Sequence, residues 1–170
     1  MNNREQLWLN QTQARVLSLY SHGKNNIMKK HSILLVEDDE LDVISVQRSL
    51  KQLESEYELH CAYNGIEALA MLNDSDTPLK PDVILLDLNM PKMNGTEFLK
   101  ILREDEMIRH HKVFIMTTSA ESADRTLTED LGISGYIIKP LNYNDNTKRS
   151  DSMDAFVQFH LRKILADEGE

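Results

Sequence analysis

A run of four apolar residues, Val83–Leu86, constrains the fold of this chain more than any other stretch. Pro81 and Asp82 come directly before the run, Asp87 comes directly after it, and Pro91 follows four residues later. A short apolar run with such boundaries is typical of a strand that is buried on both faces of a parallel sheet. In open α/β sheets, ligands and reacting groups gather at the carboxyl ends of the strands, which is where Asp87 stands. Taken alone, Asp87 is equally well explained as an ordinary turn residue. Whether it is a functional residue therefore depends on which side chains stand at the ends of the other strands.

Similar runs recur along the chain and alternate with apolar residues at helical spacing. The predicted strands are Ser32–Val36, Tyr57–Ala62, Asp82–Leu86, Lys112–Met116 and Gly135–Ile138. The predicted helices run from Leu41 to about Leu53, over Ile66–Leu72, around Phe98, up to Gly132, and around Phe156 to Ile164. Strict alternation with short links predicts an α/β fold, a doubly wound (βα)5 parallel sheet. We expect the flavodoxin-like strand order 2-1-3-4-5.

Composition excludes several classes of protein. A length of 170 residues suits one domain with a sizeable core. The net charge of −9, without a basic stripe, argues against a nucleic-acid partner. The single cysteine, Cys61, excludes an internal disulfide and fits a reducing cytosol. No apolar run approaches the roughly 18 residues of a membrane span, and no signal peptide is evident, so we expect a cytoplasmic protein without membrane contacts.

Chemically active side chains stand at four of the predicted strand ends. Glu37 and Asp38 follow the first strand, and Asp87 follows the third, which is its neighbour in the expected order. Thr117 follows the fourth strand and Lys139 the fifth, so a hydroxyl and an ammonium group should line the far side of the same crevice. Crowded carboxylates repel one another, and a hard divalent cation such as Mg²⁺ relieves that repulsion.

The residues alone suggest how such a site would work. Asp38 and Asp87 are expected as direct Mg²⁺ ligands, and Glu37 as a ligand through water, because adjacent residues rarely both point inward. Asp87 is ionised at neutral pH and could attack phosphorus without a general base. Lys139 and Thr117 could then donate to the phosphoryl oxygens, which accumulate charge during the transfer.

These residues, in this order and context, resemble the receiver domain of two-component response regulators. The run Asp-Leu-Asn-Met-Pro-Lys-Met-Asn-Gly at residues 87–95 is especially close to that family. The resemblance covers about residues 31–166, which leaves an N-terminal extension at 1–30, either helical or disordered, and a tail at 167–170. Too few residues follow for an output domain, so the chain resembles the single-domain regulators of the chemotaxis and phytochrome-associated types.

The resemblance implies a role for each matching residue. Asp87 would accept a phosphoryl group from a sensor histidine kinase or a phosphotransfer protein. Asp38, Asp87 and the main-chain carbonyl of Asn89 would bind Mg²⁺, which Glu37 would reach through water.

Four further positions complete the implied site and switch. Thr117 and Lys139 would contact the phosphoryl group. Tyr136 would be the aromatic residue that turns inward as Thr117 moves, and the Lys139–Pro140 bond would be a cis peptide.

The expected function is that of a phosphorylation-switched interaction protein, not a turnover enzyme, acting on a downstream protein target. The loop from Asn142 to Ser152 is longer than is usual in the family, which leaves partner choice and a homodimer open. A phosphohydrolase is one alternative, but it needs an acid/base two residues after the nucleophile, where Asn89 cannot serve. A receiver that binds partners without phosphorylation is the other, and the full set of site residues argues against it.

Overall fold

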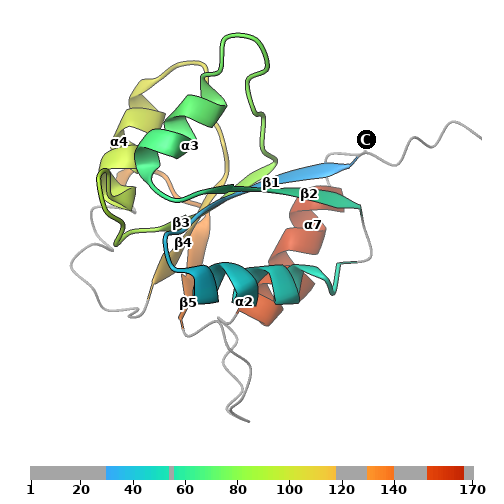
Figure 1. Ribbon diagram of the computed structural model, residues 1–170. Coiled ribbons are helices and arrows are strands. Elements are labelled where there is room, and N and C mark those ends of the chain that lie inside the picture. The colour runs from blue at the N-terminus through green and yellow to red at the C-terminus, as the bar shows by residue number, and fades with distance from the viewer. Residues whose placement is uncertain (1–29, 54–55, 118–129, 140–152, 167–170) are drawn as a thin grey trace, which may run out of the picture.

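Five parallel strands form one sheet at the centre of the molecule (Figure 1). The computed structural model describes residues 30–53, 56–117, 130–139 and 153–166. The strands are β1 (His31–Val36), β2 (Tyr57–Ala62), β3 (Val83–Asp87), β4 (Val113–Thr117) and β5 (Gly135–Ile138). Their order is β2-β1-β3-β4-β5, and every neighbouring pair is parallel. The predicted doubly wound sheet and its strand order are confirmed.

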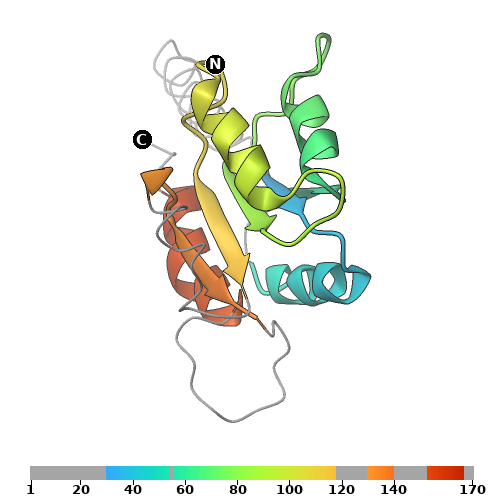
Figure 2. The same cartoon turned by 90° about the vertical axis from the view of Figure 1, so that its left-hand side faces the viewer.

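Helices cover both faces of this sheet. They are α2 (Glu40–Leu50), α3 (Gly65–Leu72), α4 (Gly95–Glu104), and a C-terminal helix made of α6 (Met153–Ala155), the π-helical stretch η1 (Phe156–Leu161) and α7 (Arg162–Ala166). In Figure 1, α3 and α4 lie on one face, and α2 and α7 lie on the other. Figure 2 shows the same two layers from the side.

The inner strands alternate between two hydrophobic cores, which explains why their sequences are continuously apolar. Ile33 and Leu85 pack in the core beneath α2 and the C-terminal helix, which we call the α2 face. Leu34 follows Ile33 in β1, and Ile84 precedes Leu85 in β3. Both pack in the core beneath α3 and α4, which we call the α4 face. Successive side chains of a strand point to opposite faces, so a strand covered on both sides has no polar face.

A polar side chain caps the start of each helix that follows β1, β2 and β3. Asp39 accepts from the backbone N–H groups of Leu41 and Asp42 at the start of α2. Asn64 and Asn94 cap α3 and α4 in the same way. These bonds satisfy backbone donors that have no partner inside the helix. Asp39 thus marks the start of α2.

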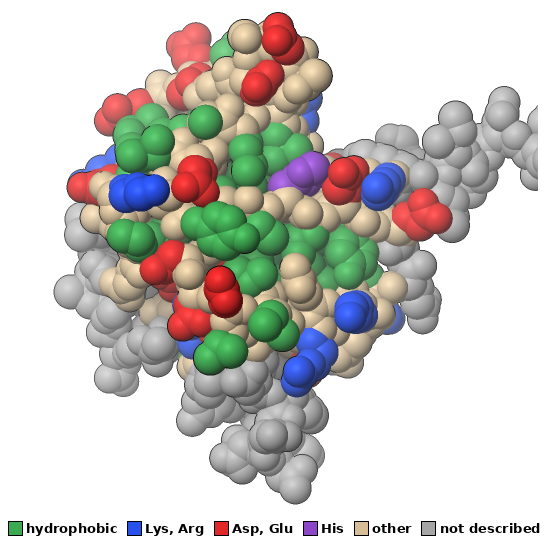
Figure 3. Space-filling model, viewed as in Figure 1, with side chains coloured by type: hydrophobic (Ala, Val, Ile, Leu, Met, Phe, Trp, Pro, Cys, Tyr) green, Lys and Arg blue, Asp and Glu red, His purple; other side chains and the backbone are tan. Residues whose placement is uncertain are grey.

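The structure corrects one detail of α2. The predicted helix is present, but it ends at Leu50 and not near Leu53. Two of the apolar residues that indicated it face outward, with Leu41 71% and Ile44 50% exposed. Hydrophobic side chains are visible at the surface around α2 in Figure 3. The buried face of α2 consists of Ser45, Val46, Ser49 and Leu50.

Several predictions fall partly or wholly outside the described residues. Residues 1–29 of the N-terminal extension, Pro140 and the loop from Asn142 to Ser152 all lie there. Of the predicted helix before β5, only the end is described, where Asp130 is helical and Gly132 has φ +66°. A glycine in that conformation directly after a helix is a common terminating signal. Among the described residues, none of the helices has the length and apolar character to cross a membrane.

Candidate functional site

The register of the sheet brings the predicted site residues to one edge. Val36 pairs with Leu86, so Glu37 and Asp87 come next at the same level of the neighbouring strands β1 and β3. Thr117, the last residue of β4, pairs with Ile138 of β5. The residues that follow these pairs therefore meet at the carboxyl edge of the sheet.

The alternation of side chains then decides which residues share a face of the sheet. Glu37, Asp87 and Lys139 each stand two residues after a core residue of the α2 face. Those three core residues are Leu35, Leu85 and Ile137. Because side chains repeat every second residue along a strand, the acceptors and the lysine converge on the side of the sheet that α2 covers.

Lys139 is the centre of this cluster. Its Nζ lies 2.8 Å from Glu37 Oε2, 2.8 Å from Asp87 Oδ1 and 2.7 Å from Asp42 Oδ2. An ammonium group has three N–H donors, and here each has a carboxylate acceptor. The Lys139 side chain is 11% exposed, so these carboxylates replace most of its water.

Burial and charge act in opposite directions on the two innermost groups. Burial raises the pKa of Glu37 to about 7, and the nearby Asp87 adds to this rise, although Lys139 donates to the Glu37 carboxylate. Burial by itself lowers the pKa of Lys139, but its hydrogen bonds with Asp42, Asp87 and Glu37 outweigh burial and raise the pKa above its usual value. Lys139 is therefore charged at any physiological pH.

Asp87 is held at both carboxylate oxygens. Oδ1 accepts from Lys139, and Oδ2 accepts from the backbone N–H of Asn89 at 2.6 Å. The residue is only 4% exposed. The carboxylate is thus fixed in orientation at the end of β3, with its hydrogen bonds coming from one ammonium and one amide group.

Three carboxylates of the site are close enough to share a cation. Oxygens of Glu37, Asp38 and Asp87 all lie within 4.8 Å of one another. Glu37 and Asp87 are buried, whereas Asp38 is exposed at the rim. Within the described ranges, this is the only group of three or more His, Cys, Asp or Glu residues with such spacing. A set made entirely of carboxylate oxygens suits a hard divalent cation such as Mg²⁺.

The structure places the two predicted switch residues on the α4 face of the sheet. Tyr136 is partly buried against the core beneath α3 and α4. Thr117 stands two residues after Ile115 of the same core, so the strand alternation assigns it to the same side. Thr117 also joins β4 to the lysine, because its carbonyl oxygen accepts from the Lys139 backbone N–H at 2.7 Å.

Asp42 is the site residue that the sequence did not reveal. It lies in the first turn of α2, where an acidic residue is ordinary because it complements the helix dipole. Its partner, Lys139, is 97 positions further along the chain. Only the packing of α2 across the carboxyl end of the sheet brings the two together.

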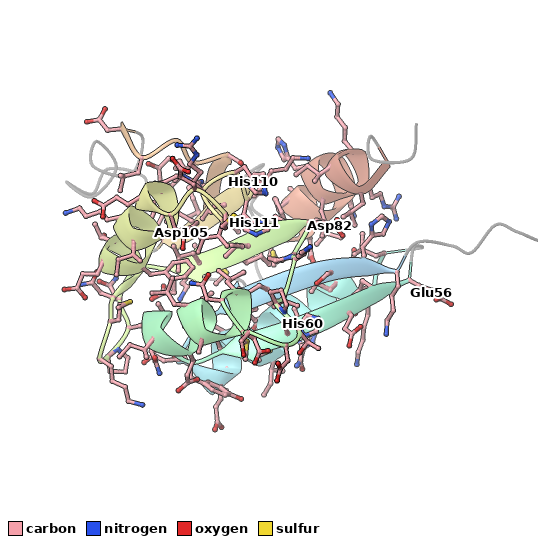
Figure 4. All side chains as sticks on the ribbon, turned by 90° about the horizontal axis from the view of Figure 1, so that it is seen from above. Glu56, His60, Asp82, Asp105, His110 and His111 are labelled. Carbon is pink, nitrogen blue, oxygen red and sulfur yellow. The ribbon has the colours of Figure 1, made fainter. Side chains whose placement is uncertain are left out.

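The histidine pair lies away from this site. Figure 4 shows His110 and His111 close to Asp82, which lies just before β3 begins. His110 is exposed and His111 is half-buried. Burial, reinforced by the neighbouring His110, lowers the pKa of His111.

Known proteins share both the sequence pattern and the fold. The family model of the response regulator receiver domain matches residues 33–150. Response regulator Rcp1 of Synechocystis sp. is 32% identical over 127 residues, which are 73% of this chain and 86% of Rcp1. The structure of the Mn²⁺-bound form of Rcp1 aligns with a TM-score of 0.66 at 31% identity, over 76% of this chain and 93% of that chain. The structure of the phosphorylated cyanobacterial phytochrome response regulator RcpA aligns with a TM-score of 0.61 at 33% identity, over 66% of this chain and 83% of that chain.

The match therefore extends over most of the described sheet and its helices. Proteins of this kind are signalling components of two-component systems and not classical turnover enzymes. Sequence, strand order and the acidic edge of the sheet agree, and this chain belongs to the response regulator receiver domain family.

Proposed function

We propose that this protein accepts a phosphoryl group on Asp87 and signals through a phosphorylation-dependent contact with another protein. One observation carries the proposal. The Asp87 carboxylate is fixed between the Lys139 ammonium and the Asn89 N–H, beside the carboxylates of Glu37 and Asp38. The donor would be a phosphohistidine on a sensor histidine kinase or a phosphotransfer protein.

The transfer forms one bond and breaks one. A carboxylate oxygen of Asp87 bonds to phosphorus, and the bond between phosphorus and the donor's imidazole nitrogen breaks. The electron pair of the broken bond stays on the imidazole ring, which then takes a proton from solvent. Asp87 needs no general base because a carboxylate is already the nucleophilic form.

Asp38, Asp87 and the main-chain carbonyl of Asn89 would hold Mg²⁺, and Glu37 would reach it through water. The spacing of the three carboxylates supports this assignment. The Mn²⁺-bound form of the relative Rcp1 supports it as well. When bound, the cation would supply positive charge to the phosphoryl oxygens. Glu37, which stands deepest in the site, must be ionised to take part.

The remaining polar groups of the site would orient the phosphoryl group. Lys139 has three donors and can exchange one carboxylate acceptor for a phosphoryl oxygen without losing the others. The Thr117 hydroxyl would donate from the far side of the crevice. Movement of Thr117 would then be read by Tyr136, which lies on the same face of the sheet and borders the core under α4.

The first test is covalent. With Mg²⁺ and a small donor such as acetyl phosphate, the protein should gain one phosphoryl group that is labile to alkali and to hydroxylamine, as seen by intact-mass spectrometry. Asp87→Asn should gain none. Asp74→Asn is the matched control, because Asp74 is an exposed loop aspartate whose bonds stay within its own turn.

Equal labelling of the Asp87→Asn variant and the unaltered protein would refute the assignment of Asp87. Steady release of inorganic phosphate from many phosphate monoesters would instead favour a hydrolase.

A further inference from the structure

We propose that Asp42 is a positioning residue, which keeps the Lys139 ammonium beside Asp87 when a divalent cation takes the lysine's other two acceptors. This inference rests on the proposed metal-dependent function. It assigns a role to a carboxylate that lies outside the group of three that would hold the cation.

The three contacts of Lys139 are not equivalent. Glu37 and Asp87 belong to the group whose oxygens lie within 4.8 Å of one another. Both would serve the cation, Asp87 directly and Glu37 through water. Asp42 does not belong to that group, although its Oδ2 is 2.7 Å from Lys139 Nζ. Of the three carboxylates that accept from Lys139, Asp42 is therefore the one that would not interact with a bound cation.

A cation and an ammonium group cannot share the same carboxylate oxygens without strong repulsion. Binding of the cation would therefore push Lys139 Nζ away from Glu37 and, in part, from Asp87. The lysine side chain is only 11% exposed, so water can replace few of the hydrogen bonds that its ammonium group would lose. A buried charge without a partner is costly, so the displaced ammonium needs another acceptor nearby.

Asp42 is well placed to be that acceptor. It lies in the first turn of α2, and its own backbone N–H is held by the capping side chain of Asp39. Its side chain is 23% exposed, more open than Glu37 at 1%. The ammonium can therefore stay at the mouth of the crevice, next to the place where the phosphoryl group would arrive.

The role predicts a coupling between Asp42 and the cation that passes through Lys139. Without the Asp42 carboxylate, the lysine stays on Glu37 and Asp87 and competes with Mg²⁺ for their oxygens. Asp42→Asn should therefore weaken Mg²⁺ binding by about fivefold to tenfold, because the neutral amide oxygen is a weaker acceptor for the ammonium group; a loss of this size is comparable to one ordinary hydrogen bond.

The test is a calorimetric Mg²⁺ titration of the full chain at pH 8. Glu40→Gln is the matched control, because Glu40 is an exposed carboxylate in the same first turn of α2. We expect its Kd to rise less than about twofold, since exposed charges are well screened. Asp42→Glu, which keeps the charge on a longer side chain, should bind within about twofold of the unaltered protein. If Asp42→Asn does not fold, Asp42→Ser, which also removes the charge, takes its place with the same expected loss of affinity.

Asp42→Asn is also made in a Lys139→Met background. This comparison separates an effect that passes through Lys139 from direct electrostatic attraction between the Asp42 carboxylate and Mg²⁺. With the lysine gone, we expect Asp42→Asn to change the Kd no more than Glu40→Gln does. If Asp42→Asn weakens binding equally with and without Lys139, or if Glu40→Gln matches it, the positioning role is wrong and the proposed metal site stands. If the unaltered protein binds no Mg²⁺ at millimolar concentration, the proposed function itself is wrong.

Discussion

At the scale of single residues, Glu37 couples the site to pH. It is 1% exposed, and burial raises its pKa from an ordinary 4.5 to about 7. Between these two values the folded protein without metal binds more protons than the unfolded chain does. The free energy of unfolding must therefore fall as the pH rises from about 4.5 to 7. Below this range the carboxyl group is protonated in both states, and its burial as an ion costs nothing.

We expect Glu37→Gln to remove this part of the pH dependence. Measured by urea unfolding in EDTA, the variant should gain stability relative to the unaltered protein as the pH rises from 5 to 8, by roughly 1–3 kcal/mol. The difference between the two proteins isolates Glu37 from His111, whose lowered pKa gives a slope of the opposite sign. A constant difference across this range would show that Glu37 ionises normally in the folded protein.

The residues at the strand ends were predictable, and Asp42 was not, for a physical reason. Glu37 and Lys139 directly follow strands and Asp87 is the last residue of one, so the parallel sheet alone determines that they meet. Asp42 reaches the site only because α2 crosses the edge of the sheet at a particular rotation. A helical pattern gives the period of a helix but not the orientation of its first turn.

At the scale of elements, α4 starts in close contact with the end of β3. The Gly95 N–H donates to the Leu88 carbonyl oxygen at 3.0 Å. A Cβ at position 95 would overlap the Asp87 carbonyl oxygen and lie 2.8 Å from Leu88 Cα. Only glycine lets the helix approach the strand this closely, so position 95 fixes the spacing between α4 and the site.

We therefore expect Gly95→Ala to lower the free energy of unfolding by about 2 kcal/mol or more, because backbone atoms have to move. Gly65→Ala is the comparison. Its Cβ would meet the side chain of Met93 at 2.7 Å, which can rotate, and Phe98 Cβ at 2.9 Å. Urea unfolding should rank Gly95→Ala as the more destabilised variant. The reverse order would mean that β3 and α4 separate easily.

The elements themselves were largely readable from the sequence. Apolar runs gave the three inner strands β1, β3 and β4 to within one residue at each end, because inner strands of a covered sheet have no polar face. The edge strands β2 and β5, which are only partly buried, were also predicted with the ends that the structure has. The rotation of α2 about its own axis, which decides which residues are buried, was harder to predict from the sequence. Leu41 and Ile44 lie at helical spacing but outside the core, whereas the small residues Ser45 and Ser49 are buried.

At the scale of the whole molecule, α4 is tied to the segment before β5. Arg103 near the end of α4 donates to the carbonyl oxygens of Leu131 and Gly132 at 2.8 and 3.1 Å. Tyr136 of β5 packs in the core beneath the same helix. The end of α4 and the segment that leads into β5 are therefore joined by hydrogen bonds, so a shift at the end of β5 would act on both.

For the proposed switch, we expect Thr117→Ala to accept phosphate at Asp87 but to lose the response of β5. The readout is NMR shifts or amide exchange of Gly135–Ile138, with and without beryllofluoride as a phosphate mimic. Thr77→Ala, at an exposed threonine in the loop before β3, serves as the control. If Thr117→Ala responds to the mimic as the control does, Thr117 is not the residue that links the two faces.

The strand alternation at the carboxyl edge also has a consequence for timing. Asp87 and Lys139 belong to the side of the sheet under α2, whereas Tyr136 belongs to the side under α4. A donor protein that approaches over α2 would leave the α4 side uncovered. A target could then dock before the donor departs, so that delivery and readout overlap within one ternary complex instead of taking turns.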